Sequence, residues 1–406
     1  MDRKSLLKFG FITLLLVSST VLSIGSIENS YEEDFSDLEY CDKEFCHENY
    51  IELHVCDQWQ NEEKGSHYKD VLNLRSREKV EHLSVDDNYT PRDPIYINGN
   101  DDFHDKAEEN NWFGDGTEQN PYIIEEYEIC GRDTETGHPN YAVIIRNTDV
   151  HFEVRNNFLF GASHPNPGSS TSAVALTNVN NGVIRNNKMR SNSHGINLLV
   201  GSSYNEVLNN TLIDNDRAIL INSNNNTIAG NNVTIEDGSP MFSLGGIYLR
   251  DSAEYNTLTR NRISKYYDTG GEGRGIYASE LSNNNLIYHN IFIDNEVHAL
   301  DHGDNIWNKP YPTGGNYWDN HTEPDEYSGP DQDEPGSDGF VDEPKEIKGE
   351  GDNVDKYPLT TPTPPKVEEE EDDDVLDRIR DIPGFTSLML LPSVMIAVAI
   401  YRKKKE

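Results

Sequence analysis

The chain has 406 residues, with 72 acidic against 34 basic side chains, a formal net charge of −38 and a hydrophobic content of 34%. This length fits one elongated domain with appendages. The charge argues against nucleic acid or an anionic membrane surface as a partner, and it is typical of a solvated acidic surface or of a protein that binds cations.

Residues 1–26 have the order of a secretory signal. The basic residues Arg3, Lys4 and Lys8 precede an apolar run, and small residues follow that run. This order predicts export of the protein.

Residues 27–92 are acidic and polar and contain no repeat. The chain has four cysteines, three of them in this region and one in the first repeat: Cys41, Cys46, Cys56 and Cys130. An even number of cysteines in an exported chain favours two disulfides, with three connectivities open. The alternative is a zinc or copper site, because His47 and His54 lie among the cysteines, although their spacing matches no standard zinc motif.

Residues 93–121 carry a run of aromatic and turn residues immediately before the repeats. A solenoid needs its open end covered, so this segment is predicted to be an N-terminal cap. Trp112 and Phe113 are expected to pack within it.

Residues 122–304 repeat a short phrase: an aliphatic residue, two variable positions, Asn, one variable position and another apolar residue. Tyr127 takes the place of Asn in the first copy. The seven copies start at Ile124, Val154, Ile184, Val207, Ile228, Leu258 and Ile287. Successive starts are 30, 30, 23, 21, 30 and 29 residues apart, so the unit is about 22 residues with insertions.

Each repeat also has a second apolar run, such as 218–221, and no repeat contains a helical stripe. Strands this short cannot bury a face alone, but coiling the chain pairs each strand with its copy in the next turn, about 4.8 Å away. The sequence therefore predicts an all-β parallel β-helix of about seven coils. The alternative solenoid, a leucine-rich repeat, needs a Leu-rich frame, whereas these positions are mostly Ile and Val.

The Asn of the phrase is predicted at an inward corner of each coil, where its amide bonds to the coils above and below. Breaking one rung of this ladder is expected to cost about 1–3 kcal/mol. The six predicted rungs are Asn157, Asn187, Asn210, Asn231, Asn261 and Asn290.

Three insertions, residues 161–172, 236–245 and 266–274, fall between the Asn strand and the second strand. Insertions at equivalent points of a solenoid project from one side, so these are expected to wall a groove. The alternative is that they accumulate where they do no harm.

Residues 305–359 are predicted to be a C-terminal cap with an acidic loop. The aromatic residues expected to plug the end are Trp307, Tyr311, Tyr317 and Trp318. The acidic loop offers oxygen ligands of the kind that calcium prefers, and the alternative is a solvated acidic loop. Its four carboxylates are Asp331, Asp333, Asp338 and Asp342.

Residues 360–382 form a Pro-rich and then acidic stalk, and residues 383–406 contain an apolar stretch followed by basic residues. This order predicts a C-terminal membrane anchor with the basic tail inside and the rest of the protein outside. Five N-x-S/T sequons fit a glycosylated surface protein: Asn88, Asn209, Asn225, Asn232 and Asn320.

The phrases GNDDF, NPYIIEEYEI, YPTGGNYWDN and GSDGFVDEP, together with the I-x-x-N coils, resemble archaeal members of the NosD-like family of periplasmic copper-binding β-helix proteins. The resemblance covers roughly residues 93–360. It implies a right-handed parallel β-helix of the class found in carbohydrate-binding proteins and sugar hydrolases. Because the coils hold no Met/His cluster, copper is not expected to carry over from the resemblance; no cofactor is required, and calcium is the metal expected in the acidic loop.

The C-terminal end, with Pro383, Gly384 and Phe385, resembles the PGF-CTERM sorting signal of archaea. That resemblance implies cleavage by an archaeosortase-type enzyme and attachment of a lipid. The alternative is a plain membrane anchor, and both place the β-helix at the cell surface.

The sequence gives only weak evidence for catalysis. The run from Asn147 to Asp149 is similar to one polygalacturonase motif, but the partner motifs are missing. The acidic corners at 214–216 and 294–296 belong to coils three apart, about 14 Å by strand spacing, whereas glycosidase carboxylates lie about 5–9.5 Å apart.

The favoured function is a surface-anchored β-helix that binds extracellular polysaccharide or surface-layer components, as an adhesion or scaffold module. One alternative is a carbohydrate-active enzyme, namely a polysaccharide lyase, hydrolase or epimerase. The other is a metal-handling accessory protein.

Overall fold

The computed structural model describes residues 89–131, 140–163, 171–236, 245–267 and 273–364, all within the compact unit Glu52–Glu406. The predicted signal peptide, three of the four cysteines, the sequon at Asn88, most of the stalk and the sorting motif lie outside these residues. Among the helices of the described ranges, none has the length and apolar character needed to cross a membrane.

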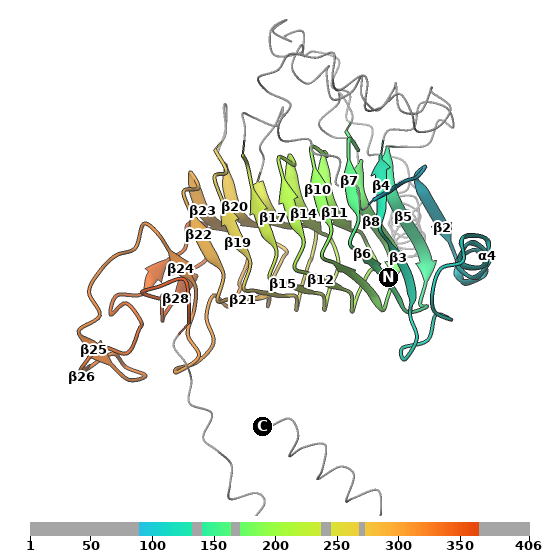
Figure 1. Cartoon of the computed structure of the whole chain (residues 1–406). Helices are drawn as coiled ribbons and strands as arrows, with labels where there is room; N and C mark the ends of the chain where they lie inside the picture. Colours follow the sequence, from blue (N-terminus) through green and yellow to red (C-terminus); the bar gives the residue numbers. More distant parts are fainter. Residues whose placement is uncertain (1–88, 132–139, 164–170, 237–244, 268–272, 365–406) are drawn as a thin grey trace, which may run out of the picture. The chain divides into compact units, whose positions relative to one another are not determined.

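Three long parallel sheets form the body of the molecule (Figure 1). Sheet A contains β1 (Thr90–Pro91), β4 (Tyr127–Cys130), β7 (Phe158–Phe160), β10 (Lys188–Arg190), β13 (Thr211–Ile213), β16 (Asn232–Thr234), β19 (Arg262–Ser264), β22 (Ile291–Ile293) and β24 (Tyr317–Trp318). Sheet B contains β2 (Ile95–Asn98), β5 (Tyr141–Thr148), β8 (Ser172–Val179), β11 (His194–Leu198), β14 (Arg217–Ile221), β17 (Gly245–Leu249), β20 (Arg274–Ala278) and β23 (Val297–Asp301). Sheet C contains β3 (Tyr122–Glu125), β6 (Phe152–Arg155), β9 (Gly182–Arg185), β12 (Glu206–Leu208), β15 (Thr227–Ala229), β18 (Thr257–Thr259) and β21 (Leu286–Tyr288).

The chain visits sheets C, A and B in turn, and each visit adds one strand beside the strand of the preceding coil. Seven such rounds, from β3 to β23, make seven coils. The structure therefore confirms the predicted right-handed parallel β-helix and its repeat region.

The interior of the coils is filled by aliphatic side chains that stack on their counterparts in neighbouring coils. One such row in sheet B is completely buried: Val143, Val174, Ile196, Ile219, Ile247 and Ile276. A strand of three to five residues is stable here because every coil buries the apolar face of the next.

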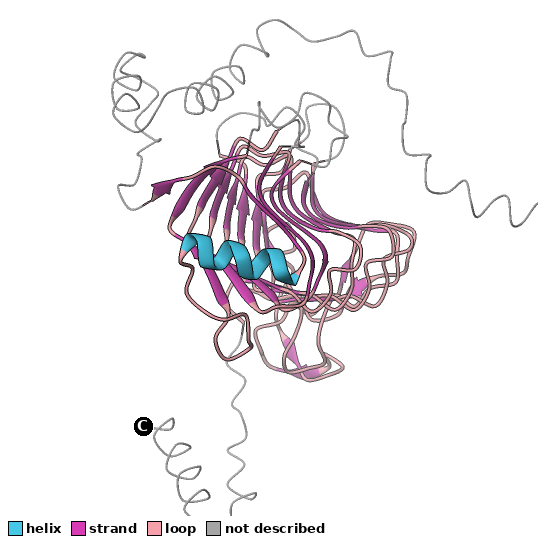
Figure 2. Ribbon diagram, turned by 90° about the vertical axis from the view of Figure 1, so that its right-hand side faces the viewer, coloured by secondary structure: helices cyan, strands magenta, loops and turns pink. Residues whose placement is uncertain are grey.

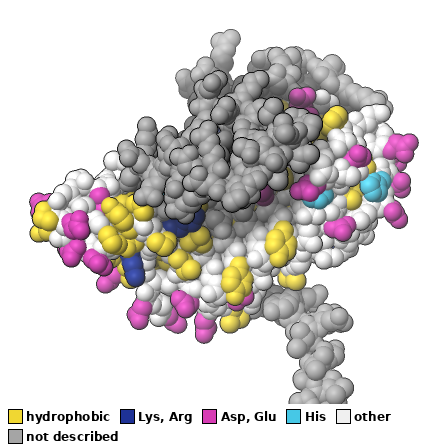
Figure 3. Space-filling model, turned by 90° about the horizontal axis from the view of Figure 1, so that it is seen from below, with side chains coloured by type: hydrophobic (Ala, Val, Ile, Leu, Met, Phe, Trp, Pro, Cys, Tyr) yellow, Lys and Arg dark blue, Asp and Glu magenta, His cyan; other side chains and the backbone are white. Residues whose placement is uncertain are grey.

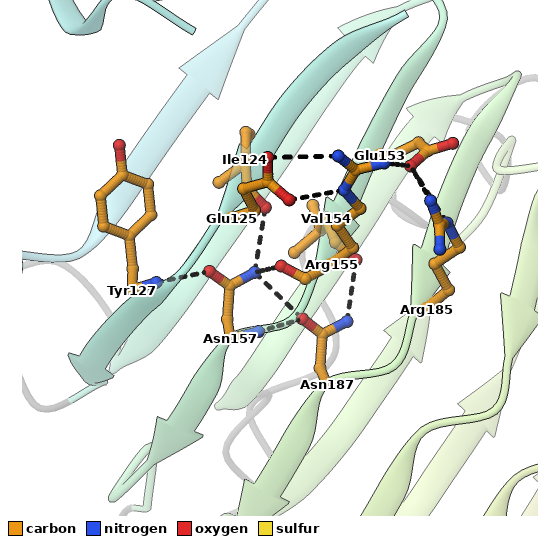
Figure 4. Close-up of polar contacts among 9 residues, drawn as sticks. All are labelled: Ile124, Glu125, Tyr127, Glu153, Val154, Arg155, Asn157, Arg185 and Asn187. Atoms are coloured by element: carbon orange, nitrogen blue, oxygen red, sulfur yellow. Dashed lines mark hydrogen bonds and ion pairs between the residues drawn. The ribbon is translucent and has the colours of Figure 1, made fainter. Parts of the chain in front are cut away.

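The predicted asparagine ladder is confirmed at the corner between sheets C and A (Figure 4). Asn157 accepts a hydrogen bond from the Tyr127 amide (3.0 Å), and its side-chain amide donates to Asn187 Oδ1 (3.0 Å) and to the Ile124 carbonyl (3.0 Å). The same exchange continues through the other predicted rungs and ends at Asn316. Each coil is thereby held to the next by buried amide hydrogen bonds.

Two further asparagine ladders occupy the other corners and were not predicted. The ladder between sheets B and C contains Asn205, Asn226, Asn256, Asn285 and Asn305. The ladder between sheets A and B contains Asn192, Asn215 and Asn295. The residue before a ladder asparagine often has a left-handed backbone, as at Asn209 (φ 54°) and Tyr204 (φ 60°), and this bend turns the chain from one sheet to the next.

The ladder between sheets A and B is interrupted at Tyr266. This side chain is completely buried, its amide donates to Asn295 Oδ1 (3.1 Å), and its hydroxyl makes no hydrogen bond to any described residue. Burial of the hydroxyl raises its pKa. An unsatisfied buried hydroxyl destabilises the fold.

We therefore expect Tyr266→Phe to raise the free energy of unfolding by about 1 kcal/mol, measured by urea denaturation. The matched control is Tyr122→Phe, since the Tyr122 hydroxyl lies 2.6 Å from His104 Nδ1 and its loss is expected to destabilise. A destabilised Tyr266→Phe variant would show that the hydroxyl has a partner.

The N-terminal end of the coils is covered by helix α4 (Asn100–Asn110), which lies across the first coil (Figure 2). Its buried Phe103 stacks on Tyr122 (ring centroids 5.3 Å apart) and packs against Trp112 and Phe152. The cap was predicted, but its helix was not, because only Phe103 and Ala107 mark an apolar face in this polar segment. The expectation for Phe113 is wrong, since its side chain is 70% exposed.

The C-terminal end is closed by Trp307 and Trp318, as predicted. Both are buried, and Trp318 stacks on Phe292 of the last coil at 4.3 Å. Two short hairpins follow: β25 (Tyr327–Ser328) with β26 (Glu334–Pro335), and β27 (Lys345–Glu346) with β28 (Val354–Asp355).

The first ladder ends on a buried carboxylate, Asp355. Its Oδ2 accepts from the Asn316 amide (2.7 Å) and from Trp318 Nε1 (3.0 Å), and its Oδ1 accepts from the Tyr357 amide (3.2 Å). Burial raises the pKa of Asp355 to about 7, against 3.8 for an unburied group. Between pH 3.8 and about 7, the Asp355 carboxyl therefore keeps a proton in the folded state that it has lost in the unfolded state.

This difference predicts a pH-dependent stability. The contribution of Asp355 is fully present below pH 3.8 and is lost as the pH rises to about 7. Asp355→Asn is expected to remove this part of the pH dependence of stability. The measurement compares the unfolding free energy of the variant with that of wild type from pH 4 to pH 8. Parallel pH profiles would contradict the assignment.

Candidate functional site

The outer face of sheet B carries a row of arginine and tyrosine side chains. Five of these side chains, from three successive coils, form what we call the arginine–tyrosine strip: Arg217, Tyr248, Arg250, Arg274 and Tyr277. Register pairing places Arg217, Gly245 and Arg274 in one row and Leu220, Tyr248 and Tyr277 in the next. The strip therefore crosses the strands along the axis of the solenoid.

Within the strip, two of the three guanidinium groups stack on a tyrosine ring. The Arg217 guanidinium lies 5.3 Å from the centre of the Tyr248 ring, and that of Arg274 lies 5.2 Å from Tyr277. The two tyrosine rings are 5.0 Å apart. Stacking of this kind fixes the orientation of the two guanidinium planes.

His194, one coil before Arg217, orients that arginine. Its Nδ1 donates to the Thr171 carbonyl (2.9 Å), so Nε2 accepts from Arg217 Nη1 (3.2 Å). Burial, assisted by the charges of Arg217 and Arg250, lowers the pKa of His194 to about 4. The imidazole is therefore neutral near pH 7, and two arginine charges lie close to it.

Several polar atoms on this face are buried without a hydrogen bond to any described residue. They are Thr171 Oγ1, Ser172 Oγ, Asn197 Oδ1, Arg217 Nε and Asn222 Oδ1. Most buried polar atoms in proteins have a partner. These atoms are closed off from solvent in the structure, so they add a cost of burial on this face rather than a contact surface.

The arginines of sheet C provide a contrast. Arg155 makes a bidentate contact with Glu125 (2.7 and 3.2 Å), and Arg185 pairs with Glu153 (2.7 Å; Figure 4). These half-exposed pairs neutralise each other and add little stability. On the strip, burial lowers the pKa of Arg217, and the charge of Arg250 acts in the same direction, while Tyr248 and Asp216 oppose it.

The surroundings of the strip are acidic overall. The chain carries a net charge of −38, and on the face drawn in Figure 3 acidic side chains are scattered over both ends while lysine and arginine occupy small areas. A local cluster of cations in such a protein is an attractive site for an anion.

The three predicted insertions begin beside this face. Each connects a strand of sheet A to the next strand of sheet B, at β7–β8, β16–β17 and β19–β20. Arg217 and Arg274 stand at the starts of their strands, next to that corner. Residues 164–170, 237–244 and 268–272 lie outside the described residues, so the walls of the predicted groove stay a prediction.

The acidic corner at Asp214 does not form a glycosidase pair. Asp214 Oδ2 contacts Arg190 Nη2 (3.1 Å), and its Oδ1 accepts from the Glu236 amide (2.8 Å). The carboxylate is thus occupied by structural contacts, in agreement with its interpretation as a corner residue.

The four carboxylates proposed for calcium are not brought together. Asp338 accepts from the amides of Gly329 and Phe340, and Asp342 accepts from those of Glu326 and Tyr327. Asp331 and Asp333 are exposed. Within the described ranges, no group of three or more His, Cys, Asp or Glu is placed to hold a metal ion. Asp338 and Asp342 instead fix the turns of the loop.

Other predicted residues are placed as follows. Cys130 is buried at the end of β4 and is disulfide-bonded. Of the sequons, Asn209, Asn225 and Asn320 are exposed, and Asn232 is half-buried.

Seven stacked coils and three parallel sheets define a parallel β-helix solenoid, and a strip of arginine and tyrosine side chains lies along one of its faces. The chain belongs to the NosD family, described as periplasmic copper-binding protein, whose model matches residues 95–323. An alginate lyase from Paenibacillus sp. str. FPU-7 has a similar structure over 56% of this chain and 88% of its own, with 12% sequence identity and a TM-score of 0.32. That similarity is too low to bear on function. No curated protein is significantly similar to the chain.

The described residues do not fit copper. Met189 is buried in the core. The histidine nitrogens nearest the strip and the C-terminal end are occupied, as in His194 and in His298, whose Nε2 lies 2.7 Å from Asp319. Soft or imidazole ligands must converge to bind copper, and in these parts of the chain they do not.

Proposed function

We propose that this protein is an exported, surface-anchored β-helix that binds an acidic polysaccharide along the arginine–tyrosine strip. The observation that carries the proposal is the stacking of Arg217 on Tyr248 and of Arg274 on Tyr277 along sheet B.

A polysaccharide with carboxylates matches the chemistry of the strip. Guanidinium groups bind carboxylates in a bidentate manner, and tyrosine rings offer flat apolar surfaces with a polar tip. Arg217 and Arg274 are two coils apart, about 9.6 Å by strand spacing, and Tyr248 and Tyr277 are one coil apart, so an extended polymer lying along the solenoid can contact both pairs.

The sequence supports a surface location. The N-terminal signal predicts export, the family is described as periplasmic, and the C-terminal segment predicts an anchor or a lipid-attachment signal. We propose that polymer binding serves adhesion or organisation of the surface layer.

A second candidate function is a polysaccharide lyase. It is favoured by the pairing of Arg217 with Tyr248, whose ring centre lies 5.3 Å from the guanidinium. An arginine can neutralise a uronate carboxylate, and a tyrosine can take the proton from the adjacent carbon as the glycosidic oxygen leaves. β-Elimination needs no carboxylate pair.

Both candidates are tested with one panel. The purified protein is titrated with polygalacturonate, alginate and hyaluronan, each compared with the same polymer after reduction of its carboxylates to alcohols. If the proposal holds, the protein binds at least one acidic polymer. Its affinity for that polymer weakens with salt, and binding is lost when the carboxylates of the polymer are reduced. Equal affinity for the reduced polymer would refute it.

Catalysis is followed in the same samples by the ultraviolet absorbance of unsaturated sugar ends and by new reducing ends. Unsaturated ends identify a lyase, and reducing ends without them identify a hydrolase. Binding without either product supports the non-catalytic function.

A further inference from the structure

A row of left-handed residues runs along the corner between sheets B and C, in the turn before each strand of sheet C. Its five members are Asn181, Tyr204, Asn225, Tyr255 and Asn284, with φ of 63°, 60°, 58°, 57° and 60°. The register of β9, β12, β15, β18 and β21 aligns them in successive coils. Asparagine and tyrosine therefore alternate along the row.

The two tyrosines are unusual at these positions. Asparagine accepts a left-handed backbone readily, whereas a bulky side chain there is strained. Burial does not compensate the strain, because Tyr204 is 66% exposed and Tyr255 is 57% exposed. The turn between sheets requires the left-handed backbone, as it also does at exposed Arg260 (φ 56°), but among the described residues only here does it hold aromatic rings out in solvent in two members of one row.

The spacing of the tyrosines indicates a polymer. They are two coils apart, about 9.6 Å by strand spacing, and the row runs along the solenoid axis. This distance is close to the length of two sugar units in an extended chain, so alternate rings of one chain can stack on the two tyrosines. Asn225 lies between them and is exposed, which adds an amide for hydrogen bonding to sugar hydroxyls.

The charge of the corner selects against an acidic polymer. Exposed acidic side chains lie in the turns and strands around the row: Glu206, Asp251, Glu280 and Asp304. They disfavour the approach of a polyanion. A neutral chain avoids this repulsion.

We propose that Tyr204 and Tyr255 form a second binding site, for a neutral, extended polysaccharide that lies parallel to the solenoid axis. This site is separate from the arginine–tyrosine strip and does not depend on the proposed function. A glycan on Asn225 would lie between the two rings and block the site, so the proposal replaces the expectation that this sequon is used.

The test is a depletion assay with the purified protein on microcrystalline cellulose, chitin and mannan. The decisive variant is Tyr204→Asn/Tyr255→Asn, because asparagine suits the left-handed backbone. We expect its affinity for the bound polymer to fall about tenfold, while its unfolding temperature stays unchanged or rises. Phe113→Ala, which removes another exposed ring, is the control and is expected to bind as wild type.

Three results would overturn the inference: no binding of wild type to any of the three polymers, unchanged binding by the asparagine variant, or a glycan on Asn225 of the native protein. A lower unfolding temperature of the asparagine variant would assign the tyrosines a packing role instead. Binding of the acidic polymer is measured with the same variants. Because this binding depends on the strip alone, it is expected to stay unchanged, and this result separates the two sites.

Discussion

Asn210→Ala is expected to destabilise the protein by roughly 3 kcal/mol, because one substitution removes the partners of several buried groups. Asn210 Oδ1 accepts from both the backbone amide and the side-chain amide of Asn187 (3.0 Å each). Its own side-chain amide donates to the Ile184 carbonyl (2.8 Å) and to Asn231 Oδ1 (3.0 Å). Alanine satisfies none of them, and water does not reach this corner.

The effect is measured by urea denaturation, with Asn232→Ala as the matched control. Asn232 is also in a repeat but is half-buried on sheet A and belongs to none of the ladders, so its loss is expected to change stability by less than about 0.5 kcal/mol. Equal effects of the two substitutions would show that the ladder does not stabilise the coils. Because each coil contacts only its neighbours, the transition of Asn210→Ala is also expected to broaden.

Arg217→Ala/Arg250→Ala is expected to lower the affinity for an acidic polysaccharide by roughly 100-fold, because each guanidinium supplies a charge-assisted hydrogen bond. Arg217 is oriented by His194 and by the Tyr248 ring, so it loses little side-chain entropy on binding. Calorimetric titration with the polymer that wild type binds measures the change.

The control is Arg155→Ala/Arg185→Ala, which removes the same two charges from sheet C, where glutamates neutralise them. Its affinity is expected to stay within twofold of wild type, since the two substitutions touch no part of the strip. A comparable loss in both variants would mean that net charge rather than the strip attracts the polymer. Arg217→Lys separates charge from geometry, because lysine keeps the charge but lacks the planar fork.

The sequence determined the fold to an unusual degree. The repeated aliphatic and Asn positions specify both the strand spacing and the corner at which Asn157 and its counterparts stack, since a repeat carries its tertiary contacts in its own period. The second ladder was also visible in principle, as the Asn-Asn pairs 225–226 and 284–285, and the third as the Asp-Asn pairs 214–215 and 294–295. They were missed because their aliphatic neighbours vary more.

The N-terminal helix and the strip were not visible in the same way. Helix α4 buries only Phe103 and Ala107, too few for a periodic signal. Arg217, Tyr248 and Arg274 are separated by 31 and 26 residues in sequence, and their positions within the repeat are variable, so no local pattern marks them.

What the sequence decided by itself was therefore the solenoid, its seven coils and its ladder, because those follow from short-range periodicity and from the need of each coil to bury an apolar face. The tertiary structure alone decided which outward side chains meet. Register pairing places Arg217 beside Tyr248, and it places Tyr204 two coils from Tyr255. In a solenoid, binding surfaces are built from such lateral rows of side chains. The rows form only when the loops at the corners accommodate the insertions of unequal length and the strands are in register.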